Sequence, residues 1–149
     1  MFDSFVSELG KSWKDHTELL PAFSESEVFI VDSWSPDGKW LSGHLLRKQS
    51  NASIANGNAV YSLESKRFEK LTDFGGGPVW LSDSYRLLFP YQDKIYLVDS
   101  RSKKVREIFS AGSYTIFAIS LSVSKDNRMI YYALEMNEAD IWLMTLQKE

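Results

Sequence analysis

The sequence predicts an all-β fold made of repeated units, and three observations support this. Similar segments begin at Trp34, Trp80 and Val123, and their aspartates at positions 37, 83 and 126 are 46 and 43 residues apart. Short runs of β-branched and aromatic residues alternate with turn residues inside each repeat. A content of 44% hydrophobic and 14% aromatic residues is that of a folded domain. Repeats of this length made of short strands are typical of β-propeller blades, not of helical arrays.

The second repeat, residues 77–109, shows the pattern most clearly. Its four expected strands are Pro78–Leu81, Tyr85–Phe89, Lys94–Asp99 and Lys104–Phe109. Ser82-Asp83-Ser84 separates the first two and predicts a hairpin turn. Four short strands joined by tight turns predict an antiparallel meander, which is the structure of one blade.

The first and third repeats follow the same order. In residues 28–73 the expected strands are 29–34, 39–46, 59–63 and 67–73. Pro36-Asp37-Gly38 predicts a tight hairpin turn, because Asp and Gly tolerate a positive φ. In residues 115–147 the expected strands are 116–121, 128–134 and 140–146, so this blade is expected to lack its outer strand.

The N-terminal segment is expected to supply a strand of this kind. Residues 14–20 have an acidic residue just ahead of an apolar close, as do the outer strands at 67–72 and 104–109. We therefore expect residues 14–20 to complete a blade that the C-terminal segment begins. Residues 2–9 fit either a further strand of a partial blade or an arm that packs elsewhere as a helix.

The repeats resemble a known family of propellers. The resemblance is to TolB-type, WD-like repeats of six-bladed propellers, and it is carried by Trp34-Ser35-Pro36-Asp37-Gly38-Lys39, Lys94-Ile95-Tyr96-Leu97-Val98-Asp99 and Asp140-Ile141-Trp142-Leu143-Met144. It covers about residues 14–147 and implies the C-terminal half of such a propeller. It implies little about activity, because members of the family serve as sensors, scaffolds and partner-binding modules.

Three blades are too few to surround an axis, since propellers use about four to eight. The outermost blades would leave apolar faces and an unpaired strand edge open, and both favour association. We therefore predict a homodimer of half-propellers that closes a six-bladed ring by strand exchange. The candidate closing strands contain His16, Glu18, Leu20, Ile141, Trp142 and Met144.

Charge and composition argue against several classes of partner. A net charge of −3 gives no reason to expect binding to nucleic acid or to an anionic membrane. No signal peptide and no apolar stretch of membrane-spanning length is visible, so a cytoplasmic location is expected. The absence of cysteine excludes disulfides, thiolate metal sites and a thiol nucleophile.

No pattern predicts a catalytic, metal or cofactor site within one chain. His16 and His44 are the only histidines, and there is no Gly-x-Ser-x-Gly elbow. The repeated aspartates are expected to bind turn backbone and not a metal ion. The tryptophans at 34, 40, 80 and 142 are expected to pack between blades.

A face of loops is the favoured binding region. The polar segment 47–58 joins a second strand to a third, on the face that also carries the links between blades. Gly75-Gly76-Gly77 is expected to be a flexible or positive-φ link of this kind. The candidate ligand-face residues are Arg47, Lys48, Asn51, Asn56, Phe74, Gly75 and Gly76.

These observations favour a non-enzymatic module that binds a protein, peptide or small ligand without a cofactor. The alternative is a hydrolase-type enzyme with a metal or carboxylate site on the propeller axis. That site would be built from both subunits and would include His44.

Overall fold

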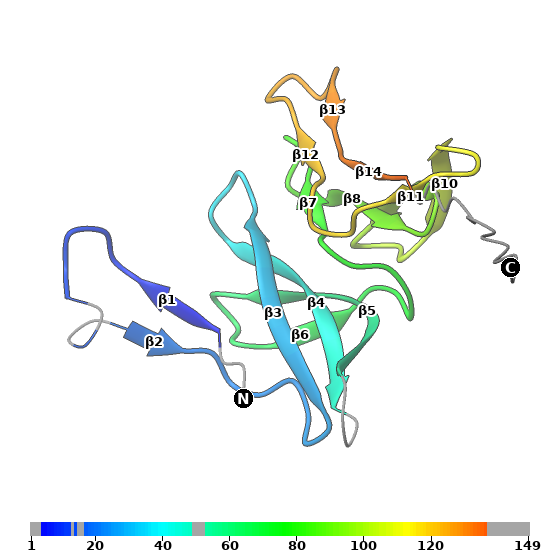
Figure 1. Cartoon of the computed structure of the whole chain (residues 1–149). Coiled ribbons are helices and arrows are strands. Elements are labelled where there is room, and N and C mark those ends of the chain that lie inside the picture. Colours follow the sequence, from blue (N-terminus) through cyan, green and yellow to red (C-terminus); the bar gives the residue numbers. More distant parts are fainter. Residues whose placement is uncertain (1–3, 13, 15–16, 49–52, 137–149) are drawn as a thin grey trace, which may run out of the picture.

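The computed structural model describes residues 4–12, 14, 17–48 and 53–136, and Figure 1 shows their arrangement. All sheets in this part of the chain are antiparallel, and none of its residues is helical. The predicted all-β fold is therefore confirmed. The described ranges contain no helix long and apolar enough to cross a membrane.

Two four-stranded sheets form the centre of the molecule. The first sheet contains β3 (Glu27–Trp34), β4 (Trp40–Lys48), β5 (Ser53–Ser62) and β6 (Phe68–Lys70). The second sheet contains β7 (Val79–Trp80), β8 (Arg86–Tyr91), β9 (Lys94–Asp99) and β10 (Val105–Ser110). Each strand pairs with the next one along the chain, so each sheet is a meander of the kind that forms a propeller blade.

Smaller units flank these sheets. The N-terminal hairpin consists of β1 (Phe5–Ser7) and β2 (Thr17–Leu19). The third repeat consists of β11 (Thr115–Ile116), β12 (Ser122–Val123), β13 (Ile130–Tyr131) and β14 (Leu134–Glu135), with β11 paired to β14 and β12 to β13. The strands that contain Trp34, Trp80 and Val123 are neighbours, because β3 contacts β7 and β7 contacts β12. In Figure 1 the N-terminal hairpin and the third repeat lie at opposite ends of the molecule.

The N-terminal hairpin decides between the two interpretations of residues 2–9. Phe5 pairs with Leu19, so the segment contributes a further strand and not a helical arm. Ser4 fixes the hairpin to the first sheet, because its hydroxyl donates to the carbonyl of Phe29 at 2.8 Å. The amide of Leu20 in turn donates to the carbonyl of Ser4 at 2.9 Å.

The polar segment 47–58 is not the open loop that the sequence predicted. β4 and β5 continue their pairing as far as Lys48 and Ser53, so most of the segment belongs to a long hairpin. The register shifts by one residue after His44, and Gly57 accommodates the shift with a φ of +99°. The prediction failed because polar residues can pair on an exposed hairpin as long as the backbone bonds are satisfied.

The third repeat also departs from its predicted strands. Of the strand expected at 116–121, only Ile116 is in a strand, β11. A turn follows, in which the amide of Ser120 donates to the carbonyl of Phe117 at 3.1 Å, and β12 begins after it. The Ser120 hydroxyl accepts a hydrogen bond from the amide of Ala133 at 2.8 Å. In a regular strand pair the acceptor for such an amide is a backbone carbonyl. The strand expected at 140–146 lies outside the described residues.

Three apolar clusters hold the layers together. The first lies between the N-terminal hairpin and the first sheet and contains Leu20, Phe29, Leu41, Leu45, Ala59 and Tyr61. The second lies between the two sheets and contains Val60, Leu71, Trp80, Leu87, Phe89 and Val98. The third lies between the second sheet and the third repeat and contains Leu81, Leu88, Ile95, Leu97, Ile116 and Leu121. Each of the two four-stranded sheets therefore packs apolar side chains on both of its faces, as in a propeller.

The repeated aspartates support the first turn of each repeat, as the sequence predicted. Asp37 accepts hydrogen bonds from the Ser35 hydroxyl at 2.6 Å and from the Lys39 amide at 3.1 Å. Asp126 accepts from the Ser124 hydroxyl and the Arg128 amide at the same two distances. Asp83 accepts from the amides of Tyr85 and Arg86 at 3.1 Å and 2.9 Å.

These turns predict a loss of stability in acid. The hydroxyl of Ser35 lowers the pKa of Asp37, and the hydroxyl of Ser124 lowers the pKa of Asp126. A lowered carboxyl pKa stabilises the folded state above the unfolded pKa of about 3.9, and this contribution is lost as the pH falls through the folded pKa. The urea concentration at the unfolding midpoint is therefore expected to decrease when the pH is lowered below about 4. It is expected to decrease less in an Asp37→Asn/Asp126→Asn variant.

Asp73→Asn is the control for this experiment. The Asp73 carboxylate is 91% exposed and pairs with Lys70 outside any hairpin turn. If the double variant and the control lose stability in acid to the same extent, the turn aspartates are not responsible.

Candidate functional site

An irregularity in β3 creates the candidate site. The pairing of β3 with β4 shifts between Val31 and Ser33, so that Asp32 has no partner opposite it. Gly43 on β4 permits this shift, because a Cβ atom there would lie 2.0 Å from the carbonyl oxygen of Ile30. His44 lies opposite Ile30, and alternation along β3 places Asp32 on the same face of the sheet as Ile30 and His44.

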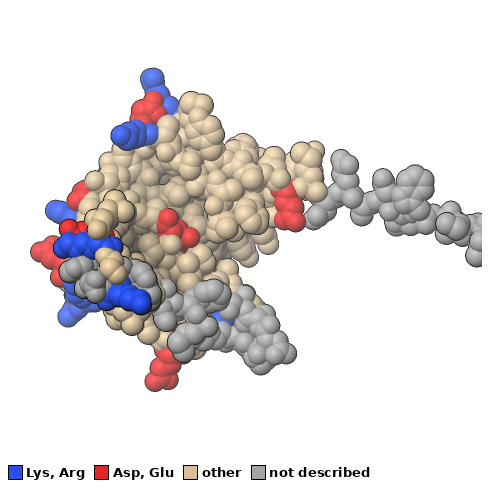
Figure 2. All heavy atoms as spheres, turned by 60° about the vertical axis from the view of Figure 1, so that its left-hand side comes forward, with Lys and Arg blue, Asp and Glu red and all other residues tan. Residues whose placement is uncertain are grey.

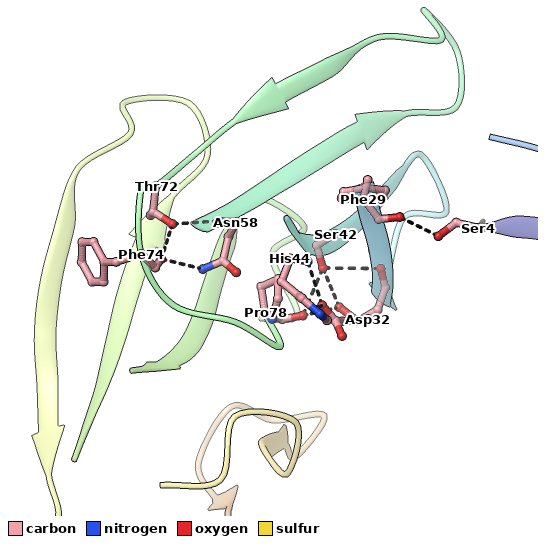
Figure 3. Close-up of polar contacts among 10 residues, drawn as sticks. Ser4, Phe29, Asp32, Ser42, His44, Asn58, Thr72, Phe74 and Pro78 are labelled. Carbon is pink, nitrogen blue, oxygen red and sulfur yellow. Dashed lines mark hydrogen bonds and ion pairs between the residues drawn. The ribbon is translucent and has the colours of Figure 1, made fainter. Parts of the chain in front are cut away.

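Asp32 and His44 form a close pair at this bulge (Figure 3). One carboxylate oxygen, Asp32 Oδ2, accepts from the His44 amide at 2.9 Å and lies 2.7 Å from His44 Nδ1. The two side chains are 14% and 15% exposed. A neutral His44 in this contact carries its proton on Nδ1, which leaves Nε2 as an acceptor for a ligand or a metal ion.

The link between the two sheets and the third repeat border the pair. A Cβ atom on Gly76 would lie 4.0 Å from the Cβ of His44 and 3.9 Å from the Cβ of Ala118. The hydroxyls of Ser33 and Ser42 lie 2.8 Å apart, and each lies within hydrogen-bond distance of the carbonyl oxygen of Pro78, at 3.0 Å and 3.2 Å. Segments of all three repeats therefore meet beside His44.

The glycine link is packed, although the sequence predicted that it could be flexible. Gly75 and Gly77 do have positive φ angles, of +93° and +55°. A Cβ on Gly75 would lie 2.3 Å from the Phe89 ring, and one on Gly77 would lie 2.1 Å from the carbonyl oxygen of Ala118. Glycine is thus required here by both conformation and space.

Phe74 belongs to the core and not to an open loop. Its ring lies edge-on to Phe89 and Tyr96, with centroids 5.6 Å and 5.2 Å away, and 5.1 Å from the ring of Tyr91. Gly75 and Gly76 are buried as well. Few side chains of the predicted ligand face are therefore left to contact a ligand at this link. The side chains next to the link that remain at least partly exposed include Asp73, Phe74 and the Asp32–His44 pair.

The long hairpin carries a second polar group. Glu27 on β3 lies 3.8 Å from Arg47 on β4 and accepts a hydrogen bond from the side-chain amide of Asn56 on β5. Arg47 is half exposed, so it is available to a ligand. Nothing is described of the Lys48 side chain, and Asn51 lies outside the described residues.

The predicted closing residues fall mostly beyond the described chain. His16, Ile141, Trp142 and Met144 lie outside it, and Glu18 is described only as a backbone position in β2. Leu20 is buried in the first cluster of its own chain, so its side chain is not available to a partner subunit. It was predicted from sequence similarity to outer strands, which does not show which neighbour a side chain contacts.

Sequence reasoning missed Asp32 and Glu27. His44 was assigned only to the alternative site on the propeller axis, and Asp32 was not recognised as its partner, because a bulge in β3 leaves no clear local signal. Within the described ranges, no group of three or more His, Asp or Glu side chains is placed to hold a metal ion. A metal site that uses His44 would therefore need ligands from elsewhere.

The fold defines this chain as a segment of a β-propeller, and comparison with solved structures agrees. A protein described as TolB from Agrobacterium tumefaciens superposes with a TM-score of 0.61 at 17% identity, over 80% of this chain and 42% of that one. An oligogalacturonate lyase in complex with manganese superposes with a TM-score of 0.54 at 14% identity, over 83% of this chain and 39% of that one. Both are β-propeller proteins.

The likeness confirms, at the level of the fold, the resemblance to TolB-type propellers seen in the sequence. The chain spans about two fifths of the length of these proteins. No protein-family model and no curated protein matches the sequence.

Proposed function

We propose that this protein is a non-enzymatic interaction module. In this proposal a second copy of the chain completes the propeller ring, and the ring binds a protein, peptide or small ligand on the face that carries the β4–β5 hairpin and the glycine link. The Asp32–His44 pair and the half-exposed Arg47 are the polar contacts offered to that ligand.

One observation carries the proposed assembly: exposed apolar side chains gather at the two ends of the layered structure. The N-terminal end exposes Phe5, Leu9 and Leu19, and the third repeat exposes Tyr114, Phe117, Ile119, Met129, Tyr131, Leu134 and Met136. Figure 2 shows that much of this face consists of uncharged residues, with an acidic side chain within it and other charged side chains nearer its edges. Apolar surface of this kind favours association with a partner.

The surroundings of His44 favour binding over hydrolysis. A Ser-His-Asp mechanism needs a serine hydroxyl bonded to the histidine nitrogen that does not contact the aspartate. The nearby hydroxyls of Ser33 and Ser42 bond instead to each other and to the carbonyl of Pro78. The pair can therefore accept or donate a hydrogen bond to a ligand, but it has no nucleophile to activate among these serines.

The mass in solution tests the assembly. Sedimentation equilibrium across a dilution series is expected to give twice the 17.1 kDa of one chain. A mass of one chain at every concentration would overturn the dimeric module.

The ligand face can be tested by thermal-shift screening against peptides and small metabolites. Ligands of the native protein are expected to lose their shift in Arg47→Ala and His44→Ala variants. Lys103→Ala is the control, because Lys103 lies in the turn between β9 and β10, on the opposite face. Equal loss in the control would place the binding site elsewhere.

A second candidate function is a hydrolase-type enzyme with a metal or carboxylate site on the axis, formed by both subunits. The open Nε2 of His44, oriented by Asp32, is the observation that favours it. Elemental analysis of the purified protein separates the two candidates. A stoichiometric, tightly bound metal that His44→Ala abolishes would favour the enzyme.

A further inference from the structure

The inference begins from equivalent positions in the repeats. Trp34, Trp80 and Val123 each precede the first turn of their repeat. Trp80 is 7% exposed and packs in the second cluster, against the first sheet. Val123 packs in the third cluster, against the second sheet. This position therefore contacts the preceding blade wherever a preceding blade is present.

Trp34 lacks such a contact. It pairs with Leu41, which is buried in the first cluster, so both belong to the face of the first sheet that looks toward the N-terminal hairpin. Yet Trp34 is 50% exposed, because the short hairpin does not reach it. A large aromatic side chain in this repeat position is the expected contact for another blade.

The third repeat leaves the complementary face open. Met129 and Tyr131 are 56% and 58% exposed, whereas Ile130 and Tyr132 pack in the third cluster. Because side chains alternate along a strand, Met129 and Tyr131 lie on the face away from the second sheet.

Two of their equivalents in the other repeats are covered by the next blade, whereas Arg86, the equivalent of Met129 in the second repeat, is partly exposed and pairs with Asp83. Trp40, the equivalent of Met129, packs in the second cluster with Trp80. Leu88, the equivalent of Tyr131, packs in the third cluster. By this equivalence, Met129 is the residue on which the tryptophan of a following blade would pack.

The turns of the repeats show that a junction in front of the first repeat would differ from the two junctions inside the chain. Ser84 accepts from the amide of Asp37, and Asn127 accepts from the amide of Ser82, so each turn is bonded to a side chain of the next repeat. The equivalent residue of the first repeat is Gly38, which has no side chain to offer. A blade that precedes Trp34 must therefore be held there by apolar contact.

We propose that Trp34 of one copy packs on Met129 and Tyr131 of a second copy, head to tail, and that two such junctions close the dimer. This rests on the proposed function and names the contact that forms the assembly. A second copy is the expected partner because the two exposed ends are complementary. Inside the chain, the residue equivalent to Trp34 packs on the preceding repeat, and Trp40 and Leu88, equivalent to Met129 and Tyr131, pack on the following repeat. Further blades of a different polypeptide are the other outcome of the test.

Cysteine cross-linking tests the contact without background, since the chain has no cysteine. A mixture of Trp34→Cys and Met129→Cys proteins is expected to form a covalent dimer on mild oxidation. Trp34→Cys alone is expected to form none, because two Trp34 residues do not face each other in a head-to-tail junction. A Trp34→Cys and Ile54→Cys mixture is the matched control, since Ile54 is a similarly exposed apolar residue on the long hairpin.

The outcomes separate this inference from the proposed function. A Trp34→Cys/Met129→Cys double variant is expected to stop at the covalent dimer, and a ladder of longer species would overturn closure. If the protein is dimeric but no cross-link forms, the proposed contact between Trp34 and Met129 is wrong, whereas the proposed dimeric module is not contradicted. A wild-type protein that is monomeric would overturn both.

Substitution of Trp34 gives an independent measurement. Trp34→Glu is expected to raise the dimer dissociation constant roughly 100-fold or more, as loss of a central aromatic contact does. Ile54→Glu is expected to leave it unchanged. Circular dichroism confirms folding, and a folded Trp34→Glu protein with an unchanged dissociation constant would overturn the inference.

Discussion

Replacement of Gly77 by alanine is expected to destabilise the protein by about 2–5 kcal/mol. The residue has a φ of +55°, which an L side chain adopts at a cost, and its new Cβ would lie 2.1 Å from the carbonyl oxygen of Ala118. That oxygen is part of the backbone, so it cannot move away without displacing the third repeat. Urea unfolding at neutral pH, followed by tryptophan fluorescence, measures the loss.

Gly112→Ala separates the two causes. Gly112 has a φ of +70°, but a Cβ there would meet nothing within 4 Å. Its substitution is expected to cost only the conformational part, about 1–2 kcal/mol. Equal losses in the two variants would show that the close approach of the link to Ala118 does not contribute.

Phe89→Ala is expected to cost about 3–5 kcal/mol, the range for removal of a buried phenylalanine. Phe89 is fully buried in the second cluster, where it stacks on Tyr96 and meets the edge of Phe74. Its ring also lies against Gly75, so its loss opens a cavity between the two sheets beside the link. The measurement is the urea midpoint at constant slope.

Tyr91→Ala on the same strand is the control. Tyr91 also contacts Phe74 but is 41% exposed, so its removal leaves no closed cavity. A loss of about 1 kcal/mol or less is expected. If Phe89→Ala and Tyr91→Ala lose equal stability, the cavity expected in the second cluster does not add to the cost of removing Phe89.

Several features could be predicted from the sequence because they depend on local chemistry. The turn around Asp37 was predicted from the residues Pro36-Asp37-Gly38, and Gly38 has the positive φ that such a turn requires. The role of Asp126 followed from its equivalence to Asp37, and its hydrogen bonds to Ser124 and Arg128 confirm it.

The candidate site could not be predicted in the same way. The contact of Asp32 with His44 joins two strands beside a bulge, and neither the strand register nor the bulge is marked in the local sequence. Likewise, Phe74 follows a charged residue and precedes three glycines, which is the composition of a loop, yet the second sheet buries its ring. Such contacts join residues that are far apart in the chain.

The sequence by itself determined the all-β class, the repeat and the chemistry of the turns, because alternating apolar residues and turn residues act over a few positions. Only the tertiary structure decided which faces are covered. It buried Trp80 and left the equivalent Trp34 exposed, although both occupy the same place in their repeats. The physical reason is that the burial of a side chain depends on the neighbouring layer. The first sheet covers Trp80 on the second sheet, whereas the N-terminal hairpin does not reach Trp34 on the first sheet.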